Sequence, residues 1–408
     1  MTNILNENYR NAKIFFDKAK KDYIYSGKKK YIDLSFASGT AILGHSSTIQ
    51  TKIFKDFTKK NLSLFAPNKY TLDLLKTLKK FLPDHYTNII FCNTGTEAVI
   101  KSLRISRAIS DKKVIANVSG SWHGSVDQLL YMPKKNLLPR QISDGLNKDD
   151  KKNLIFIPYN NIIETKQILD KVKKKLACVI IEPIQGSLPN EISFNYLKFL
   201  HNYTKKNKII LIFDEMITGV RTGCKSVQEI YKLKPDISTF GKIFGGGMPI
   251  GFLALNNKIS KKIKKRKLNI HFGGTFTSNP FTMYSSNETL KYIYKNKNKI
   301  FKKIEKYSKI FQESINDFCL KNELDIKVYR FQSMLRIIFT KDKINNRFQR
   351  DQLEKNKNLK IENFKNFLLQ KKIYYPNNGI IFFSNQSSKE NLNYFLKNFK
   401  IGLKKYFG

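Results

Sequence analysis

The sequence predicts an α/β fold, in which a large domain built on a mostly parallel sheet precedes a smaller α+β domain at the C-terminus. Two strand-like segments, 177–183 and 209–215, are almost wholly apolar and alternate with helical stretches at 166–175 and 194–205. Strands without polar alternation are typical of a parallel sheet that helices cover on both faces. A long amphipathic helix that ends near residue 320 then predicts the transition to the smaller domain.

The order of these segments divides the chain into three units. We expect an N-terminal arm over 1–45, a large domain over 46–290 and a small C-terminal domain over 291–408. Length supports this division, because a chain of 408 residues with 41% hydrophobic content is long enough for more than one core.

Apolar spacing and turn residues predict the other elements of the first two units. Residues 1–30 are polar and indicate a helical arm, and 30–34 has strand character. The elements expected next are a helix at 71–81, a strand at 88–92 that leads into a helix through 107, a strand at 114–118 and a long exposed loop at 133–153. A loop of that length indicates a mobile element of an active site.

The C-terminal unit shows shorter segments. The predicted order is a strand at 328–339, a polar insert at 341–360, a helix at 361–371, a strand at 379–383 and a helix at 389–404. Strands and helices that follow one another in this way predict an α+β domain.

The chain is strongly basic, with 75 lysines and arginines against 32 acidic residues and a net charge of +43. Such a charge is typical of nucleic-acid-binding proteins. The lysines are spread along the whole chain, however, and runs such as 173–175 are what solvated helix ends contain. We therefore expect no specific nucleic-acid partner, and we keep an inactive, nucleic-acid-binding protein on this fold as an alternative.

Cysteine usage and hydropathy indicate a cytoplasmic protein. The four cysteines are far apart and form no metal-binding pair, which favours a reducing compartment and no metal site. The segment 1–13 lacks the apolar core of a signal peptide, and no apolar run reaches membrane-spanning length. We expect no membrane partner.

A candidate anion site follows the strand at 88–92. Gly95 and Thr96 lie where that strand turns into a helix, so free backbone N–H groups and the helix dipole would face a ligand there. The alternative is simple N-capping of the helix by Thr94 or Thr96.

Two further candidates follow other strands. Trp122, the only tryptophan, lies in a loop with glycines on both sides after the strand at 114–118 and could stack on a planar ring. Asp214 ends an apolar strand, at the sheet edge where ligands of α/β proteins bind. The alternatives are packing of the tryptophan against the core and capping of a loop by the aspartate.

Lys242 stands between an apolar strand and three consecutive glycines, Gly245 to Gly247. A lysine that is desolvated in such a turn has a lowered pKa and can form a Schiff base. Taken together, Gly95, Thr96, Trp122, Asp214 and Lys242 are the groups that pyridoxal 5′-phosphate needs. They supply a phosphate site, a stacking ring, a carboxylate for the pyridine nitrogen and an amine for the aldehyde.

In these motifs the sequence resembles the class III aminotransferases, which are pyridoxal-phosphate enzymes of fold type I, and within them most of all the glutamate-1-semialdehyde 2,1-aminomutases. The motifs that carry the resemblance are, in chain order, Asn93 to Ala98, Trp122 to Gly124, Pro158 to Asn161, Ile181 to Pro183, Phe213 to Glu215, Thr218 to Arg221, Pro235-Asp236, Gly241-Lys242, Gly245 to Gly251 and Gly274 to Pro280. They cover residues 30–290 well and the rest loosely.

The resemblance implies roles for these residues. It implies a homodimer with shared active sites, in which Thr275 reaches the cofactor phosphate of the neighbouring subunit. It also implies that Lys242 holds the cofactor as a Schiff base and then moves a proton between substrate and cofactor.

Departures from the family pattern concern the substrate more than the cofactor. Trp122 replaces the usual tyrosine or phenylalanine. Ser187 replaces an asparagine of the aminomutases, and Ile217 replaces their methionine. The Ser187 hydroxyl is then the candidate for the contact to the cofactor's phenolic oxygen. The aminomutase substrate segments before Lys30 and between Tyr375 and Phe383 have no counterpart here.

These departures favour an intermolecular aminotransferase, which moves an amino group from an amino-acid donor to an aldehyde or keto acceptor. A true aminomutase, in which the amino group moves within one molecule, is the alternative. For the donor carboxylate we consider Arg330 and Arg336, because a guanidinium pairs with a carboxylate in two parallel hydrogen bonds. Either could equally be a surface or interface arginine.

Overall fold

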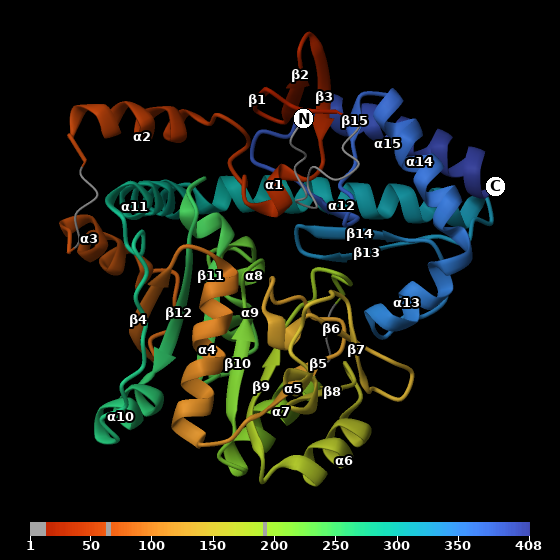
Figure 1. Ribbon diagram of the computed structural model, residues 1–408. Coiled ribbons are helices and arrows are strands. Elements are labelled where there is room, and N and C mark those ends of the chain that lie inside the picture. Colours follow the sequence, from red (N-terminus) through yellow and green to blue (C-terminus); the bar gives the residue numbers. More distant parts are fainter. Residues whose placement is uncertain (1–13, 63–66, 191–193) are drawn as a thin grey trace.

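A seven-stranded sheet forms the centre of the larger part of the computed structural model, which describes residues 14–62, 67–190 and 194–408 (Figure 1). In spatial order its strands are β4 (Tyr86–Cys92), β12 (Gly251–Asn256), β11 (Ile237–Gly241), β10 (Ile210–Asp214), β9 (Leu176–Ile181), β5 (Val114–Val118) and β8 (Leu154–Ile157). Only β12 runs antiparallel to its neighbours. The prediction of a mostly parallel sheet is confirmed.

Helices cover both faces of this sheet because its apolar strands expose alternate residues to each side. Cys178 and Ile180 of β9 pack into the same core cluster as helix α4 (Gly95–Ser110). Val179 and Ile181 pack on the other face, with α6 (Ile162–Val172) and α7 (Phe194–Lys206). Each fully buried aliphatic side chain contributes about 1.5–3 kcal/mol, so a strand buried on both faces is strongly held.

One long helix was expected up to residue 320, and the structure has two. Helices α11 (Pro280–Lys295) and α12 (Lys297–Lys321) meet at Asn296, whose N–H bonds back to the carbonyls of Tyr292 and Ile293. Asparagine competes with helical hydrogen bonding through its own side chain, which ends the first helix. Helix α12 then crosses to the C-terminal elements (Figure 1).

In the C-terminal part the expected strand 328–339 is a hairpin of β13 (Lys327–Phe331) and β14 (Met334–Ile338). Gln332, with φ of 49°, makes the turn. Strand β16 (Ile380–Phe382) pairs with β14, and α14 (Asn358–Gln370) and α15 (Lys389–Phe407) pack on each other. The helices and the strand at 379–383 are as predicted.

The polar insert expected at 341–360 is wrong as an unstructured segment, because it contains helix α13 (Arg347–Glu354) and a 3₁₀ turn, Lys355–Lys357. Asn346 caps this helix by accepting from the N–H of Gln349 at 3.0 Å. Polar composition hid the helix, since it buries little more than Arg350.

The helical arm expected at 1–30 is wrong in its described part, and residues 1–13 lie outside that part. Strands β1 (Lys18–Lys20), β2 (Tyr23–Ser26) and β3 (Lys29–Asp33) form a sheet there, and β3 also pairs with the short β15 (Ile373–Tyr374). Tyrosine and isoleucine favour strands, and Gly27 (φ of 54°) makes the tight turn.

The expected loop 133–153 is also more ordered than predicted. Strands β6 (Tyr131–Pro133) and β7 (Pro139–Gln141) make a hairpin, and α5 (Lys148–Lys152) follows it. The remaining helices are α2 (Thr48–Lys59), α3 (Lys69–Leu78) and α10 (Asn257–Lys265), with short turns α1 (Phe36–Gly39), α8 (Thr218–Arg221) and α9 (Val227–Ile230). No helix in the described ranges is long and apolar enough to cross a membrane. The boundaries of the three units remain predictions.

Gly251, at the start of β12, lets the turn before α4 approach the sheet. A Cβ at this position would lie 2.0 Å from the carbonyl oxygen of Thr94 and 2.9 Å from the nitrogen of Gly95. We predict that Gly251→Ala destabilises the fold by about 3 kcal/mol, because backbone has to move to admit the methyl group. Urea unfolding measures this, with Gly145→Ala as the control, since a Cβ there meets nothing within 4 Å. Equal losses in the two variants would contradict the prediction.

Glu215, directly after β10, is fully buried and holds the chain that follows Asp214. Its carboxylate accepts hydrogen bonds from the Thr218 hydroxyl at 2.7 Å and from the N–H of Val227 at 2.8 Å. Burial raises the pKa of Glu215 from 4.5 to about 7, against the effect of these hydrogen bonds.

The raised pKa of Glu215 predicts a pH dependence of stability. Between pH 4.5 and 7 the folded protein binds more protons at this group than the unfolded chain, so rising pH removes stability, by up to about 3 kcal/mol. Glu215→Gln does not titrate, and its stability deficit relative to wild type should therefore be larger at pH 5 than at pH 7.5. Denaturant unfolding at both values measures this, with exposed Glu390→Gln as control. A deficit that grows with pH would contradict it.

Candidate active site

The loops after four neighbouring strands meet at one edge of the large sheet, because parallel strands end on the same side. Side-chain packing shows how close they come. The Met216 side chain, after β10, lies between Gly95 and Gly241, since a Cβ at either glycine would be within 2.6 Å of it. Glu182, after β9, accepts from the N–H of Trp122 at 2.6 Å.

Asp214 is the best-connected group of this edge, and only 4% of its surface is exposed. One carboxylate oxygen accepts from the N–H of Met216 at 3.1 Å and the Thr239 hydroxyl at 2.9 Å. The other lies 2.7 Å from Nδ1 of His123. A carboxylate offers about four acceptor positions, so Asp214 can take one further donor, such as a protonated pyridine nitrogen.

His123 is a residue of this site to which the sequence assigned no role of its own. Its ring is buried, with Nδ1 on Asp214 and with Nε2 making no hydrogen bond to any described residue. The only sequence signal was its place beside Trp122, in a loop that follows a strand. Thr239 was hidden for another reason: it becomes a partner of Asp214 only through the pairing of β10 with β11.

Lys242 begins a 3₁₀ turn at the end of β11, and its φ of 49° lies in the left-handed region. For a residue other than glycine such a conformation costs on the order of 1–3 kcal/mol and is found where the surroundings impose it. Among the described residues its amine makes no hydrogen bond or ion pair of its own. Burial lowers the pKa of Lys242.

The charges around Lys242 act in both directions. The carboxylates of Glu182 and Asp214 oppose the lowering of its pKa. Arg221, on α8, adds to it. The amine is therefore more easily neutral than that of a surface lysine, which is what nucleophilic attack on an aldehyde needs.

The N-terminus of α4 faces the same edge. Thr94 is the N-cap, and its hydroxyl accepts from the N–H of Glu97 at 3.2 Å. The N–H groups of Gly95 and Thr96 come earlier in the helix and have no partner within it. N-capping thus involves Thr94, while the hydroxyl of Thr96 accepts from the N–H of Ser125 at 3.2 Å.

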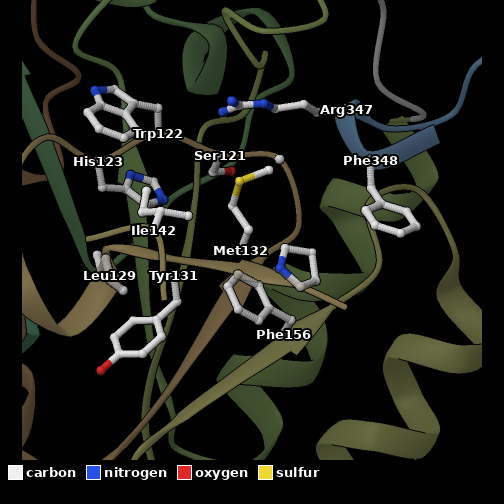
Figure 2. Close-up of a pocket in the computed structure, with 12 residues that line it drawn as sticks. Ser121, Trp122, His123, Leu129, Tyr131, Met132, Ile142, Phe156, Arg347 and Phe348 are labelled. Carbon is white, nitrogen blue, oxygen red and sulfur yellow. The ribbon is translucent and has the colours of Figure 1, made fainter. Parts of the chain in front are cut away.

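Trp122 presents its ring at the mouth of the site. Nearly half of its surface, 49%, is exposed, so packing into the core does not explain its position. With Ser121, His123 and Arg347 it lines a cavity below the ring (Figure 2).

The expected role of Ser187 is not supported. Its hydroxyl donates to the carbonyl of Gly120 at 3.0 Å. A hydroxyl has one proton, so in this arrangement Ser187 has none left for a phenolic oxygen. Gln185, two residues earlier, is buried and has an unpaired Oε1.

The structure leaves the other candidates away from these groups. Thr275 is exposed, and no contact within this chain joins it to Gly95 or Thr96 among the described residues. Arg330 donates to Gln312 at 2.9 Å, towards α12. Arg336 donates to the carbonyl of Asn378.

Arg221, which the sequence placed in a motif, is fully buried without a carboxylate partner among the described residues. It donates to the carbonyl of Gly39 and to Ser333, and it lies over the ring of Phe382 at 4.5 Å. Burial lowers its pKa to about 9. It joins α8 to the N- and C-terminal parts beside the lysine.

Comparison with known proteins agrees with the motifs. The family Aminotransferase class-III matches residues 4–358. Glutamate-1-semialdehyde 2,1-aminomutase of Methanocaldococcus jannaschii is 32% identical over 339 residues, which are 81% of this chain and 78% of that protein. The protein of that name from Thermosipho africanus is 30% identical over 406 residues, 96% of this chain and 93% of its own.

Solved structures show the same fold at low identity. An omega-transaminase from Sphaerobacter thermophilus has a TM-score of 0.88 at 19% identity, over 96% of this chain and 90% of that one. A glutamate-1-semialdehyde-aminomutase from Pseudomonas aeruginosa PAO1 has a TM-score of 0.86 at 15% identity, over 97% and 89%. The chain belongs to the class III aminotransferase family, and it is a pyridoxal-phosphate-dependent enzyme with the fold that its motifs predict.

Proposed function

We propose that this enzyme is an intermolecular aminotransferase, which takes the amino group of an amino-acid donor and gives it to an aldehyde or keto acceptor. One observation carries the proposal: the half-buried amine of Lys242 shares a sheet edge with Asp214, whose carboxylate retains an acceptor position. These are the two groups that amino transfer with pyridoxal phosphate requires.

The residues present fit the cofactor. The free N–H groups of Gly95 and Thr96 would hold its phosphate, Trp122 would stack on its ring, and Asp214 would accept from the pyridine nitrogen. When bound, the cofactor supplies an electron sink for a substrate carbon that loses a proton. Lys242 binds the aldehyde carbon and, as a free amine, takes a proton from the substrate carbon and returns it.

The other groups keep this arrangement in place. His123 holds one oxygen of Asp214, and Thr239 and the N–H of Met216 hold the other. The carboxylate is thereby kept ionised and correctly oriented for the pyridine nitrogen. Glu182 fixes the loop that carries Trp122.

An aminomutase is the second candidate, and the relatives that are 30–32% identical over most of the chain favour it. Ser187, in place of the aminomutases' asparagine, favours the intermolecular reaction. Membership of an enzyme family and the grouping of Lys242 with Asp214 leave the nucleic-acid alternative without support other than charge.

We also propose a homodimer in a reducing, cytoplasmic setting. Thr275 and its neighbour Phe276, which is 57% exposed, lie on the surface of the single chain. A second copy would cover this segment, with Thr275 of one copy beside the phosphate site of the other. All four cysteines are free and buried.

Lys242→Ala tests the attachment of the cofactor. We predict that borohydride reduction fixes pyridoxal phosphate covalently to the wild type and not to this variant, which still binds it non-covalently. Intact-mass spectrometry and cofactor absorbance measure both. Exposed Lys261→Ala is the control and should behave as wild type. Covalent cofactor on the Lys242→Ala protein would place the attachment elsewhere.

Half-reactions test the reaction itself. We predict that at least one amino acid converts the bound cofactor to its amine form and releases a keto acid, and that an aldehyde or keto acid then reverses this. Absorbance and product analysis follow both steps. If glutamate-1-semialdehyde instead gives aminolevulinate with no added donor and amino acids do nothing, the aminomutase alternative is correct.

Mixing two inactive variants tests the shared site. In a hybrid of Lys242→Ala and Thr275→Ala chains, one of the two sites has an intact lysine and, from the other chain, an intact threonine. We predict that denaturing and refolding the mixture restores wild-type cofactor affinity at that site, measured by fluorescence titration. Affinity no better than that of Thr275→Ala alone would contradict a shared site.

A further inference from the structure

Helix α13, in the segment expected to be an unstructured insert, lies against the loops of the site. Its Arg350 is buried and donates to the carbonyl of Ser187. A Cβ at Gly120 would lie 3.1 Å from Cβ of Arg347. The helix therefore packs on the loops before Trp122 and after Glu182, which brings its first turn to the cavity beside the tryptophan.

Arg347 points its guanidinium from this first turn towards Trp122 (Figure 2). Its Nε bonds to Asp351 at 3.3 Å, and its two terminal nitrogens make no hydrogen bond to a described residue. Arg350, by contrast, is saturated by Asp351, Glu354 and Ser187. Two adjacent arginines thus differ: one fixes the helix, and the other has its hydrogen-bonding edge free.

Helix stability does not explain an arginine at this place. Arg347 is the first residue of α13, where the helix dipole disfavours a positive charge. Its acidic neighbour Asp351 is shared with Arg350. A cation in this position is better accounted for by an anion that binds in front of it.

We propose that Arg347 binds the carboxylate of the amino-acid donor, an inference that rests on the proposed aminotransferase function. The cavity that it lines with Ser121, Trp122 and His123 has a volume of about 20 Å³, room for a water-sized group such as a carboxylate oxygen. The free edge of a guanidinium matches the two oxygens of a carboxylate. Arg347 is a substrate-binding, specificity-determining residue, contributed by the C-terminal part of the chain.

Matched donors test this in the holoenzyme. Isopropylamine has a methyl group where alanine has its carboxylate. Arg347→Met should lower kcat/KM for alanine by roughly 10- to 100-fold, the worth of a charge-assisted pair, and leave isopropylamine unchanged. Arg347→Lys should recover part of the loss. Arg330→Met is the control, because Arg330 faces α12, and should change neither donor. Equal losses for both donors, or a loss with Arg330→Met alone, would overturn the proposal.

A binding measurement separates this proposal from the proposed function. Trp122 is the only tryptophan and lines the same cavity, so its fluorescence reports occupancy directly, with or without cofactor. Glutarate should bind wild type and Arg330→Met alike, and Arg347→Met at least 10-fold more weakly. If wild type reacts with neither donor, the proposed function fails, and this titration still decides about Arg347. Glutarate binding that Arg347→Met leaves intact, or an effect on inorganic phosphate alone, would overturn the carboxylate assignment.

Discussion

The buried carboxylate of Asp214 is the constraint on which the site depends. An ionised carboxylate that is 96% removed from solvent is costly unless donors surround it, and here three elements supply them. Thr239 comes from the neighbouring strand, Met216 from the turn after β10, and His123 from the loop after β5. Meeting the hydrogen-bonding needs of this one group therefore brings together the loops that also carry Trp122 and Lys242.

Close backbone approach is the second constraint. Gly95, Gly241 and Gly251 have no space for a side chain, because Met216 and the Thr94 carbonyl fill it. The start of α4 can thus lie near the lysine turn, and its free N–H groups face the same space. The glycines keep the distance between the phosphate site and the amine short. A ligand of the size of pyridoxal phosphate spans that distance.

The C-terminal part contributes to the site through buried arginines rather than through its sheet. Arg221 reaches to Gly39 and Phe382 and ties the N- and C-terminal parts to the turn after β10. Arg350 fixes α13 to the carbonyl of Ser187. With that helix in place, the free guanidinium of Arg347 stands opposite Trp122. Cofactor chemistry thus comes from the large sheet, and substrate selection comes from the elements that close over it.

The sequence by itself determined the sheet and most of the groups at its edge. Apolar strands such as β9 and β10 are recognisable because both of their faces are buried, and glycines next to Thr96 and Lys242 mark sharp turns by their conformational freedom. Local composition misled where burial is slight or pairing is distant: the strands at 18–33, the hairpin at 131–141 and α13 are polar in sequence and owe their form to partners elsewhere. Only the tertiary structure decided that His123 and Thr239 hold Asp214, that Ser187 spends its proton on Gly120, and that Arg347 faces the site. Each of these is a contact between residues more than 20 positions apart, which no local pattern encodes.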